Sequence, residues 1–380
     1  MSHVKVAVIG AGIVGASCAY HLARRGAAVT VLERASLPAT GSTAKSAAGI
    51  RHQFSHPENV RMSRYSAGEF ERFERLTGMS AGYRKVGYLF LLSAEQLPDW
   101  REQAAMQRGL GARVDLLSLR DLAERYPLVA RSGLAGASFG PDDGVVDPNA
   151  VTFGFLRAAQ ALGAGLRLGE EVLALEPARG RWRLTTSQGR YQAEVIVNAA
   201  GAFAGEVARR AGFELPVLPY RRNVYMTGPA QYPHPSPLII DLTTGVWARS
   251  EGERFIVGLS NPDEAPSDAQ AVDWAWMEHC LGLATSRFPF LEAAGIDRRR
   301  SWAGLYEITP DHLPVLGRMP GAAGFVNACG FSGHGVQHAP ATGLIVAEEV
   351  VDGAVSSFDI ADFRFERFAR AARPLERNVV

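Results

Sequence analysis

The amino-acid sequence predicts an α/β fold in which a domain built on a parallel β-sheet is discontinuous along the chain and carries an inserted, mainly antiparallel second domain. Three observations predict it. A β-branched run at residues 4–9 leads through a glycine-rich turn into a helical pattern, strands and turns dominate residues 215–299, and a strand, a glycine-rich loop and a helix return from residue 325. The 380 residues, 47% of them hydrophobic, suffice for one large core or two ordinary ones.

The N-terminal unit alternates strand, turn, helix and strand. Residues 4–9 form an apolar run typical of a buried parallel strand, and residues 10–15 read GAGIVG. An alanine-rich stretch at 16–25 favours a helix. A second apolar strand, 28–32, finishes at Glu33.

Each part of this unit suits the binding of a dinucleotide. Gly10 permits a tight turn, Gly12 lets the backbone approach a pyrophosphate, and Gly15 lets the helix pack against the strand. The helix N-terminus directs its free N–H groups and its positive dipole end at the phosphates. Glu33, about 20 residues on, is placed to bind both ribose hydroxyls and would repel a 2′-phosphate, which disfavours NADP. The unit therefore predicts a dinucleotide and leaves NAD and FAD both open.

The middle of the chain departs from a plain alternation of strands and helices. Residues 41–54 form a loop of small residues, GSTAKSAAGIRHQF. Asp147 is placed to cap a helix, and residues 187–189 make the turn of a hairpin. The predicted helices cover residues 57–76, 98–126 and 147–161, and the predicted strands cover 83–92, 167–175, 182–186 and 191–197.

After the strand-rich stretch the first pattern returns. A short strand at 325–328 is followed by a glycine-rich loop at 329–335 and a helix at about 339–351, where Pro340 falls in the first turn and is tolerated. We therefore expect a Rossmann-like domain assembled from separate pieces of sequence. The predicted nucleotide-binding domain comprises residues 1–82, 143–215 and 300–380, and the predicted substrate domain comprises residues 83–142 and 216–299.

Composition excludes several classes of partner. The formal net charge is +1, from 40 basic and 39 acidic residues, which gives no electrostatic reason to expect nucleic acid or an anionic membrane. Cys18, Cys280 and Cys329 are far apart and show no metal-ligand spacing, so we expect buried thiols in a reducing cytoplasm. The chain shows no leader and no apolar run of about 18 residues, which favours a soluble cytoplasmic protein.

Four segments resemble the flavoprotein family of D-amino-acid oxidase, glycine oxidase and monomeric sarcosine oxidase. They are GAGIVG with Glu33, the 41–54 loop, WAGLYEITPDHLPVLG at 302–317 and ACGFSGHGVQHAPATG at 328–343, in the family's order. The branch that looks most similar is that of the sarcosine and proline oxidases and dehydrogenases. The resemblance implies FAD as the cofactor and a substrate domain whose large mixed β-sheet covers the flavin.

The resemblance also implies a set of residues around the substrate. Arg51 aligns with the arginine that pairs with the substrate carboxylate, a task that suits its planar fork, although one of 37 arginines (40 basic residues minus 3 lysines) can equally form a structural ion pair. His52 is as well explained by packing. Tyr306 either donates to the carboxylate or only walls the pocket. Gln337 replaces a lysine, so that the anchor is weaker or the substrate differs. Lys45 is expected near flavin N5 or O4, or at a phosphate.

The resemblance further implies how FAD is held. The glycine-rich loop 330–337 brings amides to the N1–C2=O edge of the flavin, where reduced flavin is negative, and the alternative is a plain helix-entry turn. Gly304 replaces the cysteine that attaches the flavin covalently in sarcosine oxidase, so we expect non-covalent FAD unless another residue, such as a histidine, makes a link. His334 is expected to point at the flavin or its ribityl chain. The expected FAD-binding residues are Gly10, Gly12, Ile13, Val14, Gly15, Glu33, Arg34, Ser42, Thr43, Lys45, Val172, Ala200, Gly201, Gly304, Gly333, His334, Gly335, Val336 and Gln337.

Two further positions bear on the chemistry. Sarcosine oxidase activates O2 with a lysine in its sheet, whereas the corresponding stretch here, GERFIVGLS at 252–260, has Arg254 and no lysine. That difference favours a dehydrogenase that passes electrons to another acceptor. Asp311 and His312 lie in a TPDHLP turn, where a turn-capping aspartate is more common than a catalytic dyad.

The predicted function is FAD-dependent oxidation of the C–N bond of a small amino acid, preferably a secondary amine such as sarcosine or proline, to the imine by hydride transfer to flavin N5. The alternatives are a primary-amine enzyme, as in glycine and D-amino-acid oxidase, a flavin subunit that works only in a hetero-oligomer, and an NAD-dependent dehydrogenase, against which the 330–337 loop argues. The expected partners are a small amine, O2 or a redox carrier as electron acceptor, and copies or other subunits in a homo- or hetero-oligomer, without nucleic acid or membrane insertion.

Overall fold

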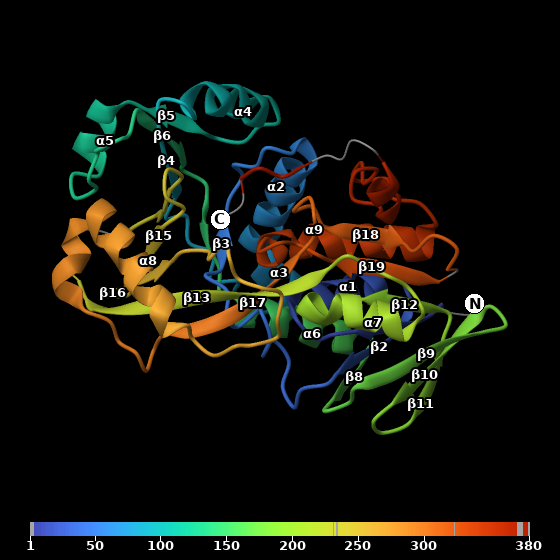
Figure 1. Cartoon of the computed structure of the whole chain (residues 1–380). Helices are drawn as coiled ribbons and strands as arrows, with labels where there is room; N and C mark the ends of the chain where they lie inside the picture. The colour runs from blue at the N-terminus through green and yellow to red at the C-terminus, as the bar shows by residue number, and fades with distance from the viewer. Residues whose placement is uncertain (1–3, 231, 233–234, 323, 371–374, 379–380) are drawn as a thin grey trace.

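Two large β-sheets organise the protein, which we describe from a computed structural model covering residues 4–230, 232, 235–322, 324–370 and 375–378. One sheet has six strands and the other has eight. The two sheets lie beside each other in Figure 1, and the strands β13 and β17 run from one toward the other. An α/β fold with a large mixed sheet, as the sequence predicts, is therefore confirmed.

The six-stranded sheet is parallel except at one edge. Its order is β18-β19-β12-β1-β2-β8, and only β18 runs antiparallel to its neighbour. Its central strands are almost fully buried, as expected for a parallel sheet covered on both faces. The strands are β1 (Lys5–Ile9), β2 (Ala28–Glu33), β8 (Gly165–Leu168), β12 (Val195–Asn198), β18 (Val315–Arg318) and β19 (Phe325–Cys329).

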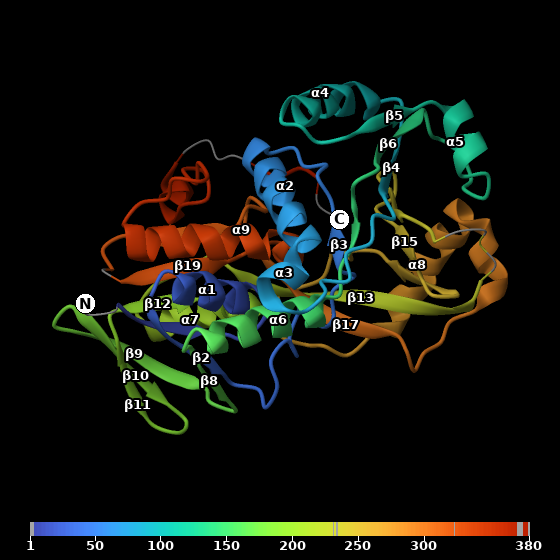
Figure 2. The same ribbon diagram turned by 180° about the vertical axis from the view of Figure 1, so that it is seen from behind.

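Helices cover one face of this sheet, and a small sheet with a short helix covers the other. The first face packs against α1 (Ile13–Arg24), α6 (Pro148–Ala161) and α9 (Gly335–Ala347) in one apolar cluster. The second face packs against α7 (Ala204–Arg210) and a three-stranded antiparallel sheet that projects at the far edge in Figure 2. The strands of that small sheet are β9 (Val172–Ala178), β10 (Arg181–Thr186) and β11 (Arg190–Ala193).

The eight-stranded sheet is antiparallel except where β4 and β14 pair in parallel. Its order is β17-β13-β16-β15-β14-β4-β6-β5. Its outer face packs against α8 (Trp274–Arg287), and its inner face carries Tyr88, Phe90 and Trp247. The strands are β4 (Tyr88–Leu92), β5 (Asp115–Leu117), β6 (Gly136–Gly140), β13 (Leu218–Pro229), β14 (Leu238–Asp241), β15 (Trp247–Glu251), β16 (Arg254–Gly258) and β17 (Trp302–Ile308).

The remaining elements connect the two sheets or cover their edges. Figure 1 shows α4 and α5 beside β5, at the edge of the eight-stranded sheet. These elements are α2 (Pro57–Glu71), α3 (Phe73–Thr77), α4 (Leu97–Gly109), α5 (Leu119–Arg125), the β3 (Gly49–Ile50) and β7 (Gly144–Val145) pair, the 3₁₀ turns Gly201–Phe203, Pro289–Ala294 and Phe365–Ala369, and the π turn Glu348–Asp352.

Several predicted elements are divided in the structure. The predicted helix 98–126 is α4, β5 and α5, because Gly111 has a φ of +82° and Ser118 starts a new helix through a reciprocal capping box with Asp121. The predicted strand 167–175 is divided at Gly169, which has a φ of +67°, into β8 and β9 of different sheets. The second arm of the predicted hairpin is likewise divided into β11 and β12.

Two helical predictions need correction. Helix α8 lies in the stretch read as strands and turns, and the Asp273 carboxylate caps it by accepting from the amides of Ala275 and Trp276. Helix α9 begins at Gly335 rather than near residue 339. Pro340 therefore lies inside it and removes the N–H that would bond to the carbonyl of Val336.

The predicted division into domains stays a proposal. The six-stranded sheet draws strands from each of the three pieces assigned to the nucleotide-binding domain, whereas β17, from the third piece, belongs to the eight-stranded sheet. Within the described residues, every helix is too short or too polar to cross a lipid bilayer.

Candidate active site

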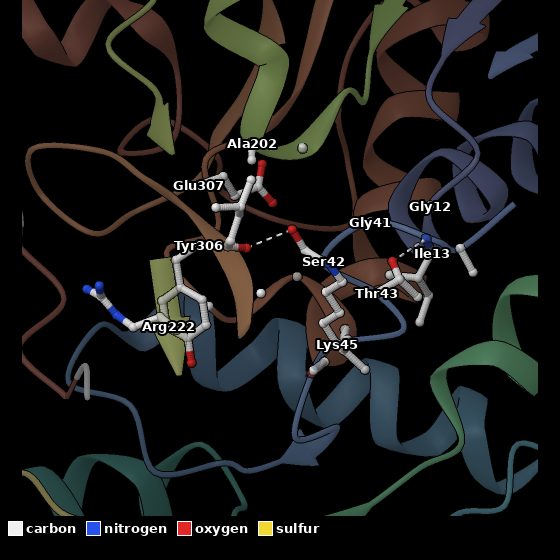
Figure 3. A pocket seen from close by; sticks show the side chains of 18 of the residues that line it. Gly12, Ile13, Gly41, Ser42, Thr43, Lys45, Ala202, Arg222, Tyr306 and Glu307 are labelled. Carbon is white, nitrogen blue, oxygen red and sulfur yellow. Dashed lines mark hydrogen bonds between the residues drawn. The ribbon is translucent and has the colours of Figure 1, made fainter. Parts of the chain in front are cut away.

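A cavity of about 340 Å³ is lined by segments of both sheets. Figure 3 shows part of its lining, with the glycine turn at one end and Tyr306 and Arg222 at the other. The lining comprises Gly10 and 12–14, 33–35, 39–43, 45–47, 199–203, 222–224, Trp247, Leu259, Ser260, Gln270, 304–307, Ala328, Gly333, Gly335 and Val336.

The glycine turn closes one end of the cavity with backbone alone. Gly10 has a φ of +104°, and a Cβ there would lie 2.4 Å from the carbonyl oxygen of Ala199. A Cβ on Gly15 would lie 1.9 Å from the carbonyl oxygen of Gly10, so this glycine serves the close packing of α1 on β1 and does not line the cavity. The turn thus presents the N-terminus of α1 to whatever fills the cavity.

The carboxylate of Glu33 lies at the end of β2, beside this turn. Its Oε2 accepts from the amide of Ala11 at 2.7 Å, and its Oε1 accepts from the amide of Ala35 at 2.9 Å. Arg34 stacks on Phe203, with Cζ 3.7 Å from the ring centre. Both residues line the cavity, and Val172 lies with them on a smaller cavity of about 70 Å³ alongside.

The 41–47 part of the small-residue loop runs along the cavity wall. The hydroxyl of Thr43 accepts from the amide of Ile13 at 3.1 Å, so it caps α1, and the hydroxyl of Ser42 donates to the carbonyl of Leu305 at 2.7 Å. The ammonium of Lys45 donates to the side-chain oxygen of Gln270, and burial lowers its pKa. Figure 3 shows that Ser42, Thr43 and Lys45 come from one continuous loop segment.

The entry to α9 meets β17 at the other end of the cavity. Gly333 has a φ of +96°, and a Cβ there would lie 2.4 Å from the Tyr306 ring, so the loop lies directly against the phenol. Burial raises the pKa of Tyr306, while the nearby guanidinium groups of Arg222 and Arg51 lower it. Tyr306 therefore lies within the electrostatic reach of two cations.

Glu307 is the carboxylic acid at this end of the cavity. Its Oε2 accepts from the amide of Gly330 at 2.9 Å. Burial raises the pKa of Glu307 to about 7, although hydrogen bonds from the amides of Gly330 and Phe331 lower it. A carboxyl group in this state gains and loses a proton near neutral pH. Nothing in the sequence pattern singled it out.

Arg51 is 3% exposed and has no carboxylate partner among the residues that the structure describes. Its guanidinium donates to the backbone carbonyls of Gln53 and Asn378 and to the ring of His334, and it lies 3.8 Å from the centre of the Phe54 ring. Burial lowers its pKa. Arg51 is not among the residues that line the 340 Å³ cavity. A buried charge without a counter-ion is costly, so its guanidinium is suited to pairing with an anion.

His334 and Gln337 are not among the residues that line the cavity, and both form hydrogen bonds with Arg51. The Nε2 of His334 lies 3.0 Å from Nη2 of Arg51, and since arginine only donates, Nε2 is the acceptor and the proton sits on Nδ1. Burial, and then Arg51, hold the pKa of His334 well below its usual range, so it is neutral. The side-chain oxygen of Gln337 accepts from the amide of Arg51 at 2.8 Å. In this structure His334 thus bonds to Arg51, and its expected place at the flavin stays a prediction.

His52 and Asp143 form a buried pair behind Arg51. The Nδ1 of His52 lies 2.6 Å from Oδ1 of Asp143, whose second oxygen accepts from the side chain of Gln53 at 3.2 Å. Asp143 is fully buried, and it fixes the two residues that follow Arg51. The packing role expected for His52 thus includes a hydrogen bond that the sequence did not indicate.

The other singled-out residues lie away from the cavity. Asp311 accepts from the amide of Leu313, as expected for a turn cap, and forms a two-point ion pair with Arg367. Arg254 donates to the carbonyl of Thr227 and to Asp297. The three cysteines are free and buried, as predicted. No group of histidine, cysteine and acidic side chains in the described part of the chain is arranged to hold a metal ion.

Arg222 on β13 is, like Glu307, a cavity residue that the sequence pattern did not single out. Its Cζ lies 5.2 Å from the centre of the Tyr306 ring, and its buried Nε has no hydrogen-bond partner in the described structure. No motif surrounds it, and only the pairing of β13 with β17 brings it to the cavity.

The lining fits FAD. The glycine turn and the α1 N-terminus suit a pyrophosphate, Glu33 suits ribose hydroxyls, and the glycine-rich entry to α9 leaves room for a planar ring beside Tyr306. Gly304 faces Lys45, and a Cβ there would lie 2.9 Å from the Lys45 Cβ. A cysteine at position 304 would therefore clash with this arrangement.

Comparison with known proteins agrees with this fit. The chain matches the family described as DAO, FAD dependent oxidoreductase, over residues 5–349. It is 32% identical to FAD-dependent oxidoreductase domain-containing protein 1 of Xenopus laevis, over 99% of this chain and 84% of that protein, and 29% identical to glycine oxidase of Geobacillus kaustophilus, over 95% and 96%. The crystal structure of L-proline dehydrogenase from P. horikoshii superposes with a TM-score of 0.90 at 30% identity, over 98% and 99% of the two chains. The chain belongs to the DAO family of FAD-dependent oxidoreductases.

Proposed function

We propose that this oxidoreductase oxidises the C–N bond of a small amino acid to the imine, and that secondary amines such as sarcosine or proline are its preferred substrates. The observation that carries the proposal is the buried guanidinium of Arg51, which has no carboxylate partner among the described residues. A substrate carboxylate suits it, because N⁺–H···O⁻ bonds are stronger than bonds to neutral carbonyls.

The surrounding residues then have separate tasks. Arg51 binds the substrate carboxylate in exchange for the carbonyl of Asn378, and Gln337 holds the backbone of Arg51 in place. Tyr306 walls the reacting end of the cavity. Lys45 lies against Gly304 of β17, and it supports the loop through Gln270. Gln337 is thus a positioning residue in this proposal, and not a second carboxylate ligand.

The chemistry that bound FAD supplies is acceptance of a hydride at flavin N5. On the substrate, the Cα–H bond breaks, its electron pair leaves with the hydrogen, and the nitrogen lone pair forms the C=N bond. The protein contributes orientation through Arg51 and a site sheltered from water.

Relatives support both classes of amine. L-proline dehydrogenase, named for a secondary amino acid, supports the leading proposal, and glycine oxidase supports the primary-amine alternative. A flavin subunit that functions only in a hetero-oligomer is the second alternative. For the electron acceptor we propose a carrier other than O2, since Arg254, the cation of the 252–260 stretch, is bound to Thr227 and Asp297 away from the cavity.

The test is an anaerobic absorption titration of the FAD-loaded protein with sarcosine, L-proline, glycine and D-alanine. Bleaching of the flavin band by sarcosine or proline, at least 10-fold more efficient than by glycine, is the expected result. If only glycine or D-alanine bleaches the flavin, the substrates are primary amines. A yellow protein that none of the four bleaches contradicts the proposal. Air admitted after bleaching should restore the colour slowly, over minutes, and immediate reoxidation would indicate an oxidase.

The expected non-covalent attachment of FAD has its own test. Precipitation of the holoprotein with acid should leave the yellow colour in the supernatant, because Gly304 offers no thiol for a covalent bond. Colour that stays with the pellet would show a link through another residue. The released flavin should run as intact FAD in chromatography.

A further inference from the structure

The position of Arg222 follows from strand register. β13 and β17 are antiparallel, with Arg222 opposite Gly304 and Tyr220 opposite Tyr306. The side chain of Arg222 therefore lies on the sheet face that carries Tyr306 and lines the cavity. In Figure 3 it lies beside the Tyr306 ring, across the cavity from the glycine turn.

Arg222 lacks the partners that its neighbour has. Arg221 points to the other face and forms ion pairs with Glu264 and Asp273, both at 3.1 Å. Arg222 donates only to the carbonyl of Arg221, at 2.9 Å, and its Nε is buried without a partner in the described structure. Burial lowers the pKa of Arg222. Glu264 and Asp273 are thus paired with Arg221, whereas Arg222 faces the cavity without a counter-ion among the described residues.

Two such cations lie near one phenol. Arg222 lies 5.2 Å from the centre of the Tyr306 ring, and Arg51 bonds to His334, the residue after Gly333, which lies against the same ring. Arg51 and Arg222 both act electrostatically on Tyr306, and neither has a carboxylate within ion-pair distance among the described residues. One substrate carboxylate neutralises only one of them. A ligand with two negative groups would neutralise both guanidinium groups.

We propose that Arg222 binds a second carboxylate of the substrate, so that the substrate is an amino dicarboxylate whose α-carboxylate is held by Arg51. This inference rests on the proposed function and names its substrate class. The reaction is unchanged: in the neutral amine the Cα–H bond breaks, hydrogen and its electron pair pass to bound FAD, and the nitrogen lone pair forms the C=N bond. The resulting iminium ion releases its N–H proton to water to give the imine, and both carboxylates remain intact.

The experiment compares matched acids on the FAD-loaded enzyme by anaerobic stopped-flow bleaching of the flavin. Sarcosine is paired with iminodiacetate, and N-methyl-L-alanine with N-methyl-L-aspartate and N-methyl-L-glutamate. We expect the diacid of at least one pair to reduce the flavin at least 10-fold more efficiently than its monoacid. The ratio of diacid to monoacid efficiency should fall by about 100-fold in Arg222→Gln, because loss of one partner of a desolvated charge pair has an effect of that order. Arg222→Lys should recover part of the ratio.

The control variant is Arg254→Gln, since Arg254 also lies on the eight-stranded sheet but does not line the cavity. The ratio of diacid to monoacid efficiency in Arg254→Gln should match that of the wild type. Each variant is first checked for FAD loading and for thermal unfolding, so that a misfolded protein is not scored.

Three results would overturn the inference. If the wild type prefers monoacids, the inference about Arg222 is wrong but the proposed function is not contradicted. An equal loss for both acids in Arg222→Gln, together with a changed flavin midpoint potential, would place Arg222 at the cofactor instead of the substrate. Failure of every amino acid of both classes to bleach the wild type contradicts the proposed function and the inference together.

Discussion

The guanidinium of Arg51 donates to acceptors from three separate parts of the sequence. Gln53 lies two residues further on, His334 belongs to the entry to α9, and Asn378 lies 327 residues away. All three are neutral, so they satisfy the N–H groups of the guanidinium without neutralising its charge. That combination keeps the cation ready for an anionic ligand.

Replacement of Arg51 should weaken substrate binding more than it changes the cofactor. In Arg51→Met we expect kcat/KM for the best amino acid to fall on the order of 100-fold or more, because the substrate carboxylate loses its counter-ion. Arg51→Lys should lose less, since it keeps the charge but not the two-pronged geometry. Steady-state kinetics and the absorption spectrum of the flavin check this. An unchanged kcat/KM in Arg51→Met would remove Arg51 from the substrate site.

Glu307 makes the stability of the FAD-free protein depend on pH. Its pKa is raised from the usual 4.5 to about 7, so between these values the folded state holds a proton that the unfolded state has released. The free energy of unfolding therefore falls as pH rises from 4.5 to 7 and stays low above. At about 1.4 kcal/mol per pKa unit, and with some screening by water in the cavity, the loss between pH 5.5 and 7.5 is about 1 to 2 kcal/mol.

The variant Glu307→Gln should abolish this dependence, because the amide is neutral at every pH. Urea unfolding of both proteins at pH 5.5 and 7.5 measures the difference. We expect the wild type to lose stability relative to Glu307→Gln at the higher pH. A difference that stays constant, or that changes in the opposite direction, would contradict a raised pKa.

Residues in local motifs were predictable, and residues placed by strand pairing were not. Gly10, Gly12 and Glu33 belong to one strand–turn–helix–strand unit, so their positions at the cavity follow from local sequence. Arg222 and Glu307 reach the cavity only through the register of β13 with β17, which no short pattern encodes. Gln337 aligned with a substrate ligand but bonds instead to the backbone of Arg51.

At the scale of elements, the entry to α9 is a tightly constrained contact of the cavity. Gly333 combines a left-handed φ of +96° with a position where a Cβ would lie 2.4 Å from Tyr306. Any side chain at this position therefore strains the backbone and displaces the phenol. The loop at Gly333 and strand β17 therefore form one continuous wall of the cavity.

Gly333→Ala should consequently impair the cavity even though it adds one methyl group. We expect the dissociation constant for FAD to rise at least 10-fold and the flavin band of the residual holoprotein to shift. Gly282→Ala is the matched control, because Gly282 lies within α8 and a Cβ there meets nothing within 4 Å. That control should bind FAD normally and gain up to about 1 kcal/mol of stability. Equal FAD binding by both variants would show that the contact with Tyr306 has no part in the site.

The predicted element boundaries were wrong where a single residue changes the direction of the chain. A helical pattern spans residues 98–126, yet Gly111 ends one helix and Ser118 starts the next, with β5 between them. Gly169 divides the predicted strand 167–175 between two sheets in the same way. Helix α8 was missed because its surroundings are rich in proline and strand formers, whereas its own cap, Asp273, was the available signal.

At the scale of the molecule, the segment 375–378 ties the two sheets together. Glu376 is 1% exposed and accepts from Ser55, His56 and Asn59, at the start of α2, while its amide donates to Asp311. Asn378 donates to Gln103 of α4 as well as accepting from Arg51. In Figures 1 and 2 this end of the chain lies beside β3.

Removal of the Glu376 carboxylate should release this segment. Glu376→Ala leaves several buried donors without an acceptor, so we expect the free energy of unfolding to fall by about 3 kcal/mol. Glu366→Ala, at an exposed position in the same region, should change it by less than about 0.5 kcal/mol. Chemical denaturation of the two variants provides the comparison. Equal stability of both would show that the segment is not held by Glu376.

The discontinuous architecture has a consequence for how the protein is made. β1 begins at residue 5, but its neighbour β12 ends at residue 198, and α9, which covers both, ends at residue 347. At about 5–20 residues per second, a ribosome needs roughly 20 to 70 seconds to reach that point. During that interval β1 and β2 have no complete sheet to join, so their apolar side chains are exposed on the nascent chain. The cavity draws its lining from Gly10 to Val336, so it is complete only after Val336 has been made.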